Sequence, residues 1–383
     1  MFKNPFSDAE MARRVAAVRA GMARRDLDLI VLAQPESVFY LTGLDHWGYF
    51  APTYLIVPAE GEMVLVTRVM EWITIGNQLR NARFAGHDDS ETAPFGLARD
   101  LNAIGLSGKR CGIEMDTLGF SYGAGQELFD RLGAGGWADI SGMVDHMRWV
   151  KSPEEMELTR AAARISDIGM QAAIAAIRDG AREADVVAEA DAAMIRAGGN
   201  PPGFGPFIRP EARINEPHTV WGDGTYKAGE RVMLELSGCV SRYHAPLGRL
   251  VHLGSIRDED AEMAGIVAKA SDAVLGALKE GTTAGAVFAA SQDVLDGFGM
   301  QDFWRHHCGY IVGIGFPPAW TGGNKVTGLR PGSDLVIREG MTFHQLNWFF
   351  DTGRGDFFAS DSIMLGPDGA ERLTHTPIGP TVL

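Results

Sequence analysis

A single acidic side chain interrupts an apolar stretch near the middle of the sequence. Glu235 stands between Leu234 and Leu236 in the run from Arg231 to Ser237, whose composition predicts a buried strand. A buried carboxylate is rare unless it is paired, and it can bind a cation, move a proton or attack an electrophilic carbon. Two interpretations stay open: Glu235 lies in a buried cavity, or it lies on the exposed face of a half-buried strand.

Three segments are predicted to form the walls of one cavity around this carboxylate. The first continues from Glu235 through a turn at Gly238 into a second strand that ends at Leu253. The second reads HHCGYIVGIGFPP (306–318), and the third reads GMTFHQLNWFF (340–350). Tyr243 and His244 alternate across the second strand, so only one of them can face the cavity, and His244 is the candidate.

The neighbouring residues His306, His307 and Cys308 have side chains that could bind a metal ion. On a strand, however, neighbouring side chains point to opposite faces, so we do not expect all three to converge on one ion. We interpret them as ordinary strand residues.

Aromatic residues are dense between Ser37 and Val57. We expect Phe39 and Tyr54 to belong to a core, and Trp47 and Tyr49 to form a hydrophobic lid over a ligand. Further apolar walls of the cavity are expected from Phe316, Trp320 and Trp348.

The elements that must position these side chains divide the chain into two parts. Alternating strands and helices predict a small α/β domain over residues 1–147. Ser152, Pro153 and the acids that follow are typical of a helix N-terminus, and a second domain is predicted over residues 148–383. In it we expect two helices followed by a strand pair, twice over: helices at 153–178, 183–197, 258–279 and 284–298, and strands at 231–237, 239–253, 342–349 and 357–365.

Composition excludes several classes of partner. The chain has 383 residues and a formal net charge of -14, which argues against binding to nucleic acid or to anionic membranes. No apolar run is long enough to span a bilayer, and the N-terminus lacks the apolar segment of an export signal. Three cysteines, none in a CxxC pair, favour a reducing compartment, so we expect a cytoplasmic protein.

Several motifs together resemble one known family. They are KSPEE at 151–155, PH at 217–218, GERVMLEL at 229–236, YHAPLGR at 243–249, GMTF at 340–343 and SDSIML at 360–365. The sequence is similar to the pita-bread family of creatinases, prolidases and methionine aminopeptidases over nearly its whole length. The resemblance implies an α+β fold, with a pita-bread C-terminal domain after a smaller creatinase-like α/β domain. It also implies a homodimer in which the partner's N-terminal domain lies near the active site.

The metallopeptidases of this family bind two metal ions through two Asp, one His and two Glu. The resemblance places these five ligand positions at Glu235, Pro246, Tyr310, Leu346 and Ser360. Proline and leucine side chains cannot bind a metal ion, so we expect neither a metal nor another cofactor.

Metal-independent branches of the family exist, and the motif combination looks closest to the ectoine hydrolases, which open a cyclic amidine. An amidinium carbon already carries positive charge, so its hydrolysis needs a carboxylate for its N–H groups and groups that transfer protons. Glu235 is expected to bind the amidinium, and it could also attack the amidine carbon.

Further roles follow from the resemblance. His218 matches the catalytic histidine of creatinase and is expected to carry a proton, unless it is a surface loop residue. Tyr310 is expected to donate a hydrogen bond to the substrate or to Glu235, unless it only fills space. Asp361 could supply a second carboxylate, unless it is an exposed strand residue.

A substrate carboxylate would require an arginine. Arg249 stands at the arginine position of the family, and Arg209 and Arg68 are weaker candidates.

The leading hypothesis is a metal-independent hydrolase of the C–N bond in a small cyclic amidine. One alternative is an Xaa-Pro dipeptidase-like metallohydrolase or a metal-dependent lyase with a rearranged site. A second alternative is a catalytically inactive pita-bread module that only binds a ligand.

Overall fold

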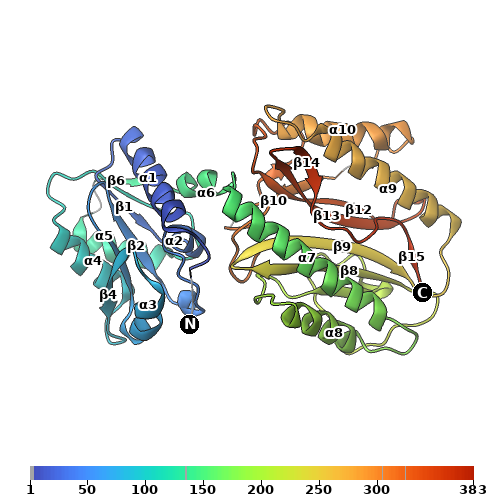
Figure 1. The fold of residues 1–383 in the computed structure, drawn as a ribbon, viewed down its shortest axis with the longest axis horizontal. Helices are drawn as coiled ribbons and strands as arrows, with labels where there is room; N and C mark the ends of the chain where they lie inside the picture. The colour runs from blue at the N-terminus through green and yellow to red at the C-terminus, as the bar shows by residue number, and fades with distance from the viewer. Residues whose placement is uncertain (1–3, 134–135, 304, 324) are drawn as a thin grey trace. The chain divides into compact units, whose positions relative to one another are not determined.

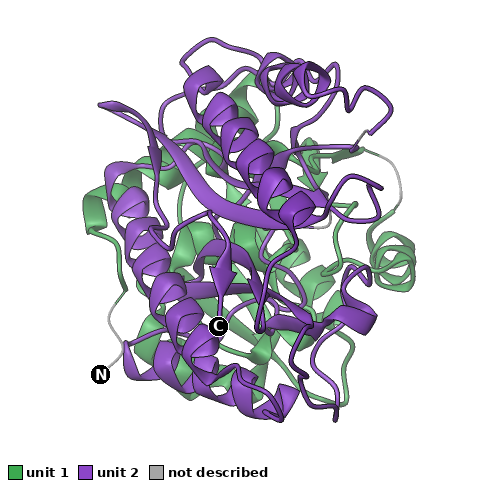
Figure 2. Cartoon of the chain, turned by 90° about the vertical axis from the view of Figure 1, so that its right-hand side faces the viewer, with its two compact units in different colours: residues 1–148 green, residues 149–383 purple. Residues whose placement is uncertain are grey.

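The computed structural model describes residues 4–133, 136–303, 305–323 and 325–383. The chain divides into two compact units, residues 1–148 and 149–383 (Figure 2). No helix in the described ranges combines the length and the apolar character that a membrane span requires.

The first unit is a mixed six-stranded sheet with the strand order β4-β3-β2-β1-β5-β6. Strands β1, β5 and β6 run parallel, whereas β2 is antiparallel to both of its neighbours. The predicted core residues Phe39 and Tyr54 are both fully buried, which confirms that assignment. The elements are α1 (Asp8–Arg24), β1 (Leu29–Leu32), α2 (Pro35–Thr42), β2 (Tyr54–Pro58), β3 (Met63–Arg68), α3 (Trp72–Gln78), β4 (Ala82–His87), α4 (Ala93–Ile104), β5 (Cys111–Ile113), α5 (Tyr122–Leu132), β6 (Trp137–Asp139) and α6 (Met143–Arg148).

The second unit is built on a nine-stranded sheet with the order β11-β10-β12-β13-β9-β8-β7, to which β14 and β15 add at β13 and β9. Ser152 caps its first helix in a reciprocal capping box with Glu155, which explains why the sequence located this helix start correctly. The elements are α7 (Pro153–Ala176), α8 (Glu183–Arg196), β7 (Phe207–Pro210), β8 (Arg231–Val240), β9 (Tyr243–His252), α9 (Asp258–Ala277), α10 (Ala284–Gly297), β10 (Gly309–Ile311), β11 (Gly328–Leu329), β12 (Thr342–Phe349), β13 (Phe357–Gly366), β14 (Gly369–Arg372) and β15 (Thr381–Val382).

This unit consists of two similar halves, each with two helices and an antiparallel strand pair (Figure 1). Helices α7 and α8 pack on β8 and β9 through a core that includes Met170, Val186, Leu234 and Leu247. Helices α9 and α10 pack in the same way against β12 and β13. The predicted order of helices and strands is therefore confirmed.

The predicted turn at Gly238 is wrong, because this residue does not form a turn. It lies inside β8, and a Cβ atom at this position would lie 2.2 Å from the carbonyl oxygen of Ala162 in α7. The glycine therefore allows the helix to approach the strand. The actual hairpin turn is at Ser241 and Arg242, whose φ angles of 47° and 68° are those of a two-residue turn with a left-handed backbone.

Candidate active site

Glu235 lies in the middle of β8 and is only 6% exposed. Its neighbours Leu234 and Leu236 face the core beneath α7 and α8. Because side chains alternate along a strand, Glu235 points to the opposite side of the sheet, here called the inner face. The alternative of a solvent-exposed carboxylate is therefore wrong.

The strand register brings the five ligand positions implied by the family together on the inner face. Glu235 lies opposite Gly248 on β9, and Gly248 lies opposite Ser360 on β13. Ser360 in turn lies opposite Leu346 on β12. Pro246 and Tyr310 belong to the next row of the same face, two residues along their strands.

Gly248 provides the room in which this row assembles. A Cβ atom at this position would lie 2.4 Å from the ring of Phe358 and 2.6 Å from Oγ of Ser360. Both distances are shorter than any normal contact, so only a residue without a side chain fits at this position.

His344 connects the members of the row, although the sequence analysis did not identify it as a site residue. Its Nε2 lies 2.8 Å from Oγ of Ser360 and 3.7 Å from Oε1 of Glu235. Its Nδ1 lies 2.8 Å from the hydroxyl of Tyr310. The oxygen of this hydroxyl accepts a hydrogen bond of 3.0 Å from Nε1 of Trp320. A usable signal existed: His344 precedes Leu346 by two residues, so alternation places both side chains on one face.

The protonation of this network follows from burial. Burial lowers the pKa of His344 to about 3, so its imidazole is neutral at physiological pH. Burial, together with the charge of Glu235, raises the pKa of Tyr310, which therefore keeps its proton. Since Trp320 donates to the phenol oxygen, we assign the phenol proton to Nδ1 of His344 and the imidazole proton to Nε2, which faces Glu235.

Burial also raises the pKa of Glu235 to about 7, against the opposing effect of Arg209. Among the residues that the structure describes, none donates a hydrogen bond to this carboxylate. Glu235 is thus a carboxylate that can both accept and release a proton near neutral pH.

His218 lies in the exposed loop that follows β7, and its ring packs against two aromatic residues. The ring centroids are 6.2 Å from Phe204 and 6.0 Å from Phe207. Phe207 is the cross-strand neighbour of Glu235. The structure therefore brings His218 to the neighbourhood of the inner face, and its role in proton transfer stays a prediction.

Asp361 and Arg249 are not part of this site, which corrects two predictions. They form a buried ion pair of 2.8 Å, and Asp361 also accepts a hydrogen bond from Thr374. Asp361 follows Ser360 directly, so alternation turns its side chain to the face opposite Glu235. It is neither a second catalytic carboxylate nor an exposed strand residue, and Arg249 is engaged away from the cavity.

His244 faces the inner side, as predicted, and holds two loops in place. Its Nε2 accepts a hydrogen bond of 2.8 Å from the backbone N–H of Gly203, and its Nδ1 lies 3.3 Å from the carbonyl oxygen of Gly313. Burial lowers the pKa of His244 to about 4, so this imidazole is also neutral at physiological pH.

The three aromatic residues predicted to form walls of the cavity lie in three different surroundings. Trp320 is buried and packs edge-on against Phe204 and Phe207. Trp348 is half-buried on the inner face of β12. Phe316 is buried, with the guanidinium of Arg242 4.5 Å above its ring.

Trp47 and Tyr49 belong to the first unit. Trp47 is 59% exposed, and the hydroxyl of Tyr49 donates to the carbonyl oxygen of Leu44 at 3.0 Å. Their role as a lid stays a prediction. Arg68 of the same unit forms a bidentate pair with Asp89, with both distances 2.7 Å.

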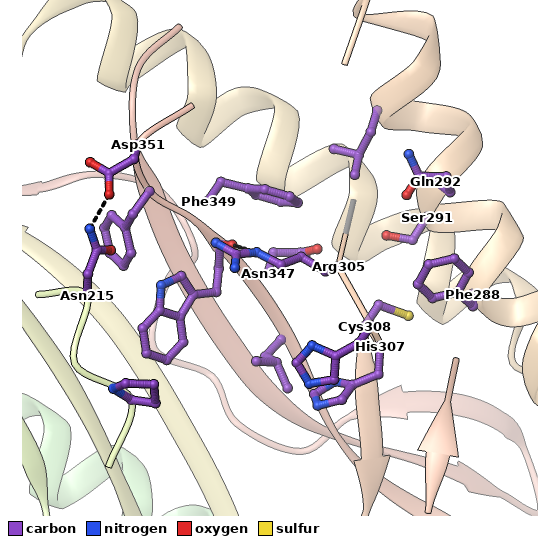
Figure 3. A pocket seen from close by; sticks show the side chains of 16 residues that line it. Asn215, Phe288, Ser291, Gln292, Arg305, His307, Cys308, Asn347, Phe349 and Asp351 are labelled. Carbon is purple, nitrogen blue, oxygen red and sulfur yellow. Dashed lines mark hydrogen bonds between the residues drawn. The ribbon is translucent and has the colours of Figure 1, made fainter. Parts of the chain in front are cut away.

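A pocket of about 390 Å³ lies along the edge of β12 (Figure 3). Leu346 and Trp348 of the inner face line it, and so do His306, His307 and Cys308. The three residues precede β10 and do not form a strand, and the rings of His306 and His307 are 4.2 Å apart. The expectation that strand alternation separates these side chains is therefore wrong.

The residues at the family's ligand positions do not suit a dinuclear metal centre. Pro246 and Leu346 offer no donor atom, and Tyr310 keeps its proton in the bond to His344. In the described part of the chain, no group of three His, Cys, Asp or Glu side chains is arranged to hold a metal ion. No chemical step is therefore assigned to a metal ion.

Comparison with known proteins agrees with this architecture. Residues 157–358 match the model of metallopeptidase family M24, and residues 14–150 match the creatinase/prolidase N-terminal domain. The chain is 30% identical to ectoine hydrolase of Halomonas elongata over 97% of both chains. It is 23% identical to the Xaa-Pro dipeptidase of Pyrococcus furiosus, over 96% of this chain and 99% of that relative.

Solved structures show the same fold. The Xaa-Pro dipeptidase from Bacillus anthracis superposes with a TM-score of 0.83 at 21% identity, covering 97% of this chain and 100% of that one. A recombinant prolidase from Thermococcus sibiricus reaches a TM-score of 0.86 at 19% identity, covering 99% and 100% of the two chains. The pita-bread sheet, the creatinase-like first unit and these matches agree with one another. The chain belongs to metallopeptidase family M24.

Proposed function

We propose that this protein is a metal-independent hydrolase that opens the C–N bond of a small cyclic amidine, with ectoine or a close relative as the substrate. The observation that carries the proposal is Glu235, a buried carboxylate that accepts no hydrogen bond from the described residues. Two N–H groups of an amidinium match two carboxylate oxygens in the bidentate manner of an arginine. The similarity to ectoine hydrolase over 97% of both chains supports this substrate class.

The reaction adds water to the amidine carbon and then breaks one ring C–N bond. The new oxygen becomes the amide oxygen of the product, and the leaving ring nitrogen takes a proton and becomes an amine. Glu235, whose pKa is about 7, can take the proton from water and return it to the leaving nitrogen. His218 is the proposed second carrier of protons.

The neutral residues around Glu235 have a positioning role in this proposal. His344 donates its Nε2 proton to Oγ of Ser360, with Oε1 of Glu235 at 3.7 Å, and Tyr310 fixes this tautomer through Nδ1. A neutral imidazole adds no positive charge that would repel the amidinium.

Attack by Glu235 on the amidine carbon is a second route to the same products. An oxygen of Glu235 bonds to the amidine carbon, the ring C–N bond breaks, and the leaving nitrogen takes a proton and becomes an amine; water then cleaves the resulting acyl-type covalent intermediate. A single turnover in water enriched in heavy oxygen, followed by mass spectrometry of the peptide that contains Glu235, separates the routes. Label in the carboxylate indicates attack by Glu235, followed by cleavage at the glutamate carbonyl, whereas label in the product alone indicates that water attacked the substrate-derived carbon.

The test of the function is hydrolysis of ectoine by protein dialysed against EDTA. We expect turnover to persist in the chelator, to disappear in Glu235→Gln, which keeps the size of the side chain, and to be strongly reduced in Glu235→Asp, which retracts the charge. Activity that disappears with chelation and returns with added metal would overturn the proposal.

The related dipeptidases raise the alternative of Xaa-Pro dipeptide cleavage. The donor set argues against it, because Pro246 and Leu346 cannot bind metal ions that polarise a peptide carbonyl. Metal analysis of the purified protein and an assay with prolyl dipeptides decide between the two. An inactive binding module is indicated instead if ligand affinity exists without turnover under any of these conditions.

A homodimer in the cytoplasm is also part of the proposal. Trp47 and Tyr49 of the first unit would then close the cavity of the other protomer. Light scattering measures the size of the particle, and loss of ectoine affinity in Trp47→Ala tests this contribution.

A further inference from the structure

Arg209 is a buried cation whose hydrogen-bonding capacity is not used. The residue is 0% exposed, and neither its Nε nor its Nη1 has a hydrogen-bond partner among the described residues. Its Nη2 meets only the sulfur of Met233, a weak acceptor. A buried guanidinium normally has acceptors for its five N–H groups, because unmet donors lose their hydration without replacement. Two unsatisfied nitrogens therefore indicate a missing acceptor.

The position of Arg209 places that acceptor next to the catalytic carboxylate. On β7, Phe207 lies opposite Glu235, and Arg209 lies opposite Met233, so Arg209 and Glu235 are diagonal neighbours on adjacent strands. Such neighbours have Cα atoms about 7–8 Å apart. The positive charge of Arg209 is close enough to lower the pKa of Glu235 against the effect of burial.

The two charges do not neutralise each other directly. Among the described residues, Arg209 forms no ion pair with Glu235 or with another carboxylate. The nearest described aromatic contact of its guanidinium is the ring of Trp348, with the guanidinium carbon 5.6 Å from the ring centroid. Trp348 is the half-buried residue that also lines the pocket at the edge of β12, so this side chain borders both Arg209 and the pocket.

Arg249 and Arg68, which could also meet a substrate anion, are already engaged, whereas Arg305 has, among the residues that the structure describes, a hydrogen-bond partner only at its Nε. Arg249 pairs with Asp361 and donates to backbone carbonyl oxygens. Arg68 pairs with Asp89 through two hydrogen bonds. Arg305 lines the pocket, but its Nε donates to the carbonyl oxygen of Trp348 at 2.7 Å.

We propose that Arg209 binds the carboxylate of the substrate while Glu235 binds its amidinium, so that the enzyme selects small zwitterions over plain amidines. This inference rests on the proposed function of the site and adds the identity of the anion-binding residue. Nε and one Nη of a guanidinium form a fork that matches the two oxygens of a carboxylate. Glu235 and Arg209 then offer one negative and one positive group on the same face of two adjacent strands.

The test compares two ligands that differ only in the carboxyl group: ectoine, and the corresponding methyl-substituted tetrahydropyrimidine in which hydrogen replaces it. Turnover and calorimetric affinity are measured for the parent, for Arg209→Met and for Arg209→Lys. Loss of a hydrogen-bonded charged pair corresponds to about 10- to 100-fold in affinity. We expect Arg209→Met to lose about this factor for ectoine and to keep its affinity for the ligand without the carboxyl group, and Arg209→Lys to recover part of the loss.

Matched arginine substitutions serve as controls. Arg68→Met removes a guanidinium that Asp89 already holds, so it should leave the preference for ectoine unchanged. Arg305→Met tests the rival arginine of the pocket, and the preference should survive in it as well. Thermal unfolding of each variant verifies folding, and Arg209→Lys keeps the test informative if Arg209→Met is unstable.

The outcomes separate this inference from the proposed function. Equal losses of both ligands in a folded Arg209→Met, or a loss of the preference in Arg305→Met instead, would overturn the role of Arg209 and leave the hydrolase function intact. A parent protein that binds and hydrolyses both ligands equally well would also remove the anion site. A parent that acts on neither ligand contradicts the proposed function itself.

Discussion

Glu235→Gln should make the protein more stable at alkaline pH while it removes activity. In the folded protein, burial raises the pKa of Glu235 from 4.5 to about 7. The folded state therefore holds a proton that the unfolded chain has already lost, and its stability falls as the pH rises from 4.5 to about 7. This shift corresponds to about 3 kcal/mol at most, reached above the folded pKa. Glutamine does not ionise, so the variant escapes the loss.

The assay is urea unfolding of the parent and the variant, followed by intrinsic fluorescence. The free energy of unfolding is compared at about pH 5 and about pH 8, on either side of the titration. We expect the difference between variant and parent to grow by about 2–3 kcal/mol in favour of the variant between these values. Other titrating groups are common to both proteins and cancel in the difference. A difference that is independent of pH, or that grows in the opposite direction, would refute the reasoning.

Asp361→Asn is the matched control, since it also converts a buried acid into its amide. Here the acid is paired with Arg249 at 2.8 Å, and the substitution leaves a buried guanidinium without its counter-charge. Breaking a buried pair in this way costs about 3–5 kcal/mol. The two amide substitutions should therefore change the stability in opposite directions above the pKa of Glu235. Stabilisation by both would show that any buried acid is costly in this sheet, whatever its partners.

Three further predictions concern the site. Tyr310→Phe should lower kcat/KM for ectoine by about 10- to 100-fold, because the neutral tautomer of His344 loses its partner at Nδ1; unchanged kinetics would mean that the tyrosine only fills space. Gly248→Ala should destabilise the fold by about 1–3 kcal/mol, since the new methyl group meets the ring of Phe358, and an unaltered melting temperature would contradict the register. The acidic limb of the pH profile of kcat/KM should lie near 7, where Glu235 loses its proton, and a limb near 4.5 would show that this carboxylate titrates normally.

The sequence was sufficient for the elements that carry local signals. The capping box at Ser152 and Glu155 marks the start of α7, and apolar periodicity defines the helices and the long strands. Gly238 shows where local signals stop, because a glycine serves turns and close backbone approaches alike. Only the position of Ala162 in α7 distinguishes the two roles, and this position depends on packing.

Chemical type alone does not identify the residues of the site, because alternation decides which face of the sheet a side chain joins. Asp361 is an acid next to the ligand position Ser360, yet adjacent residues on a strand face opposite sides. His344 stands two residues from Leu346 and shares its face. The same rule failed for His306 and His307, because they precede β10 and form no strand. Alternation is therefore informative only where strand pairing is established.

The charge balance of the inner face explains why several ligand positions of the family carry uncharged residues together in this chain. A dinuclear centre needs several carboxylates whose mutual repulsion the metal ions offset, and without the ions each carboxylate would be a buried charge of its own. This chain keeps one carboxylate of the row, Glu235, and places Ser360 and Tyr310 at other ligand positions, which stay neutral at physiological pH. The positive charge of Arg209, on the adjacent strand, opposes the negative charge of Glu235. A zwitterion brings one charge of each sign to such a site, so the net charge of the site stays the same on binding and each buried group gains the partner that it lacks.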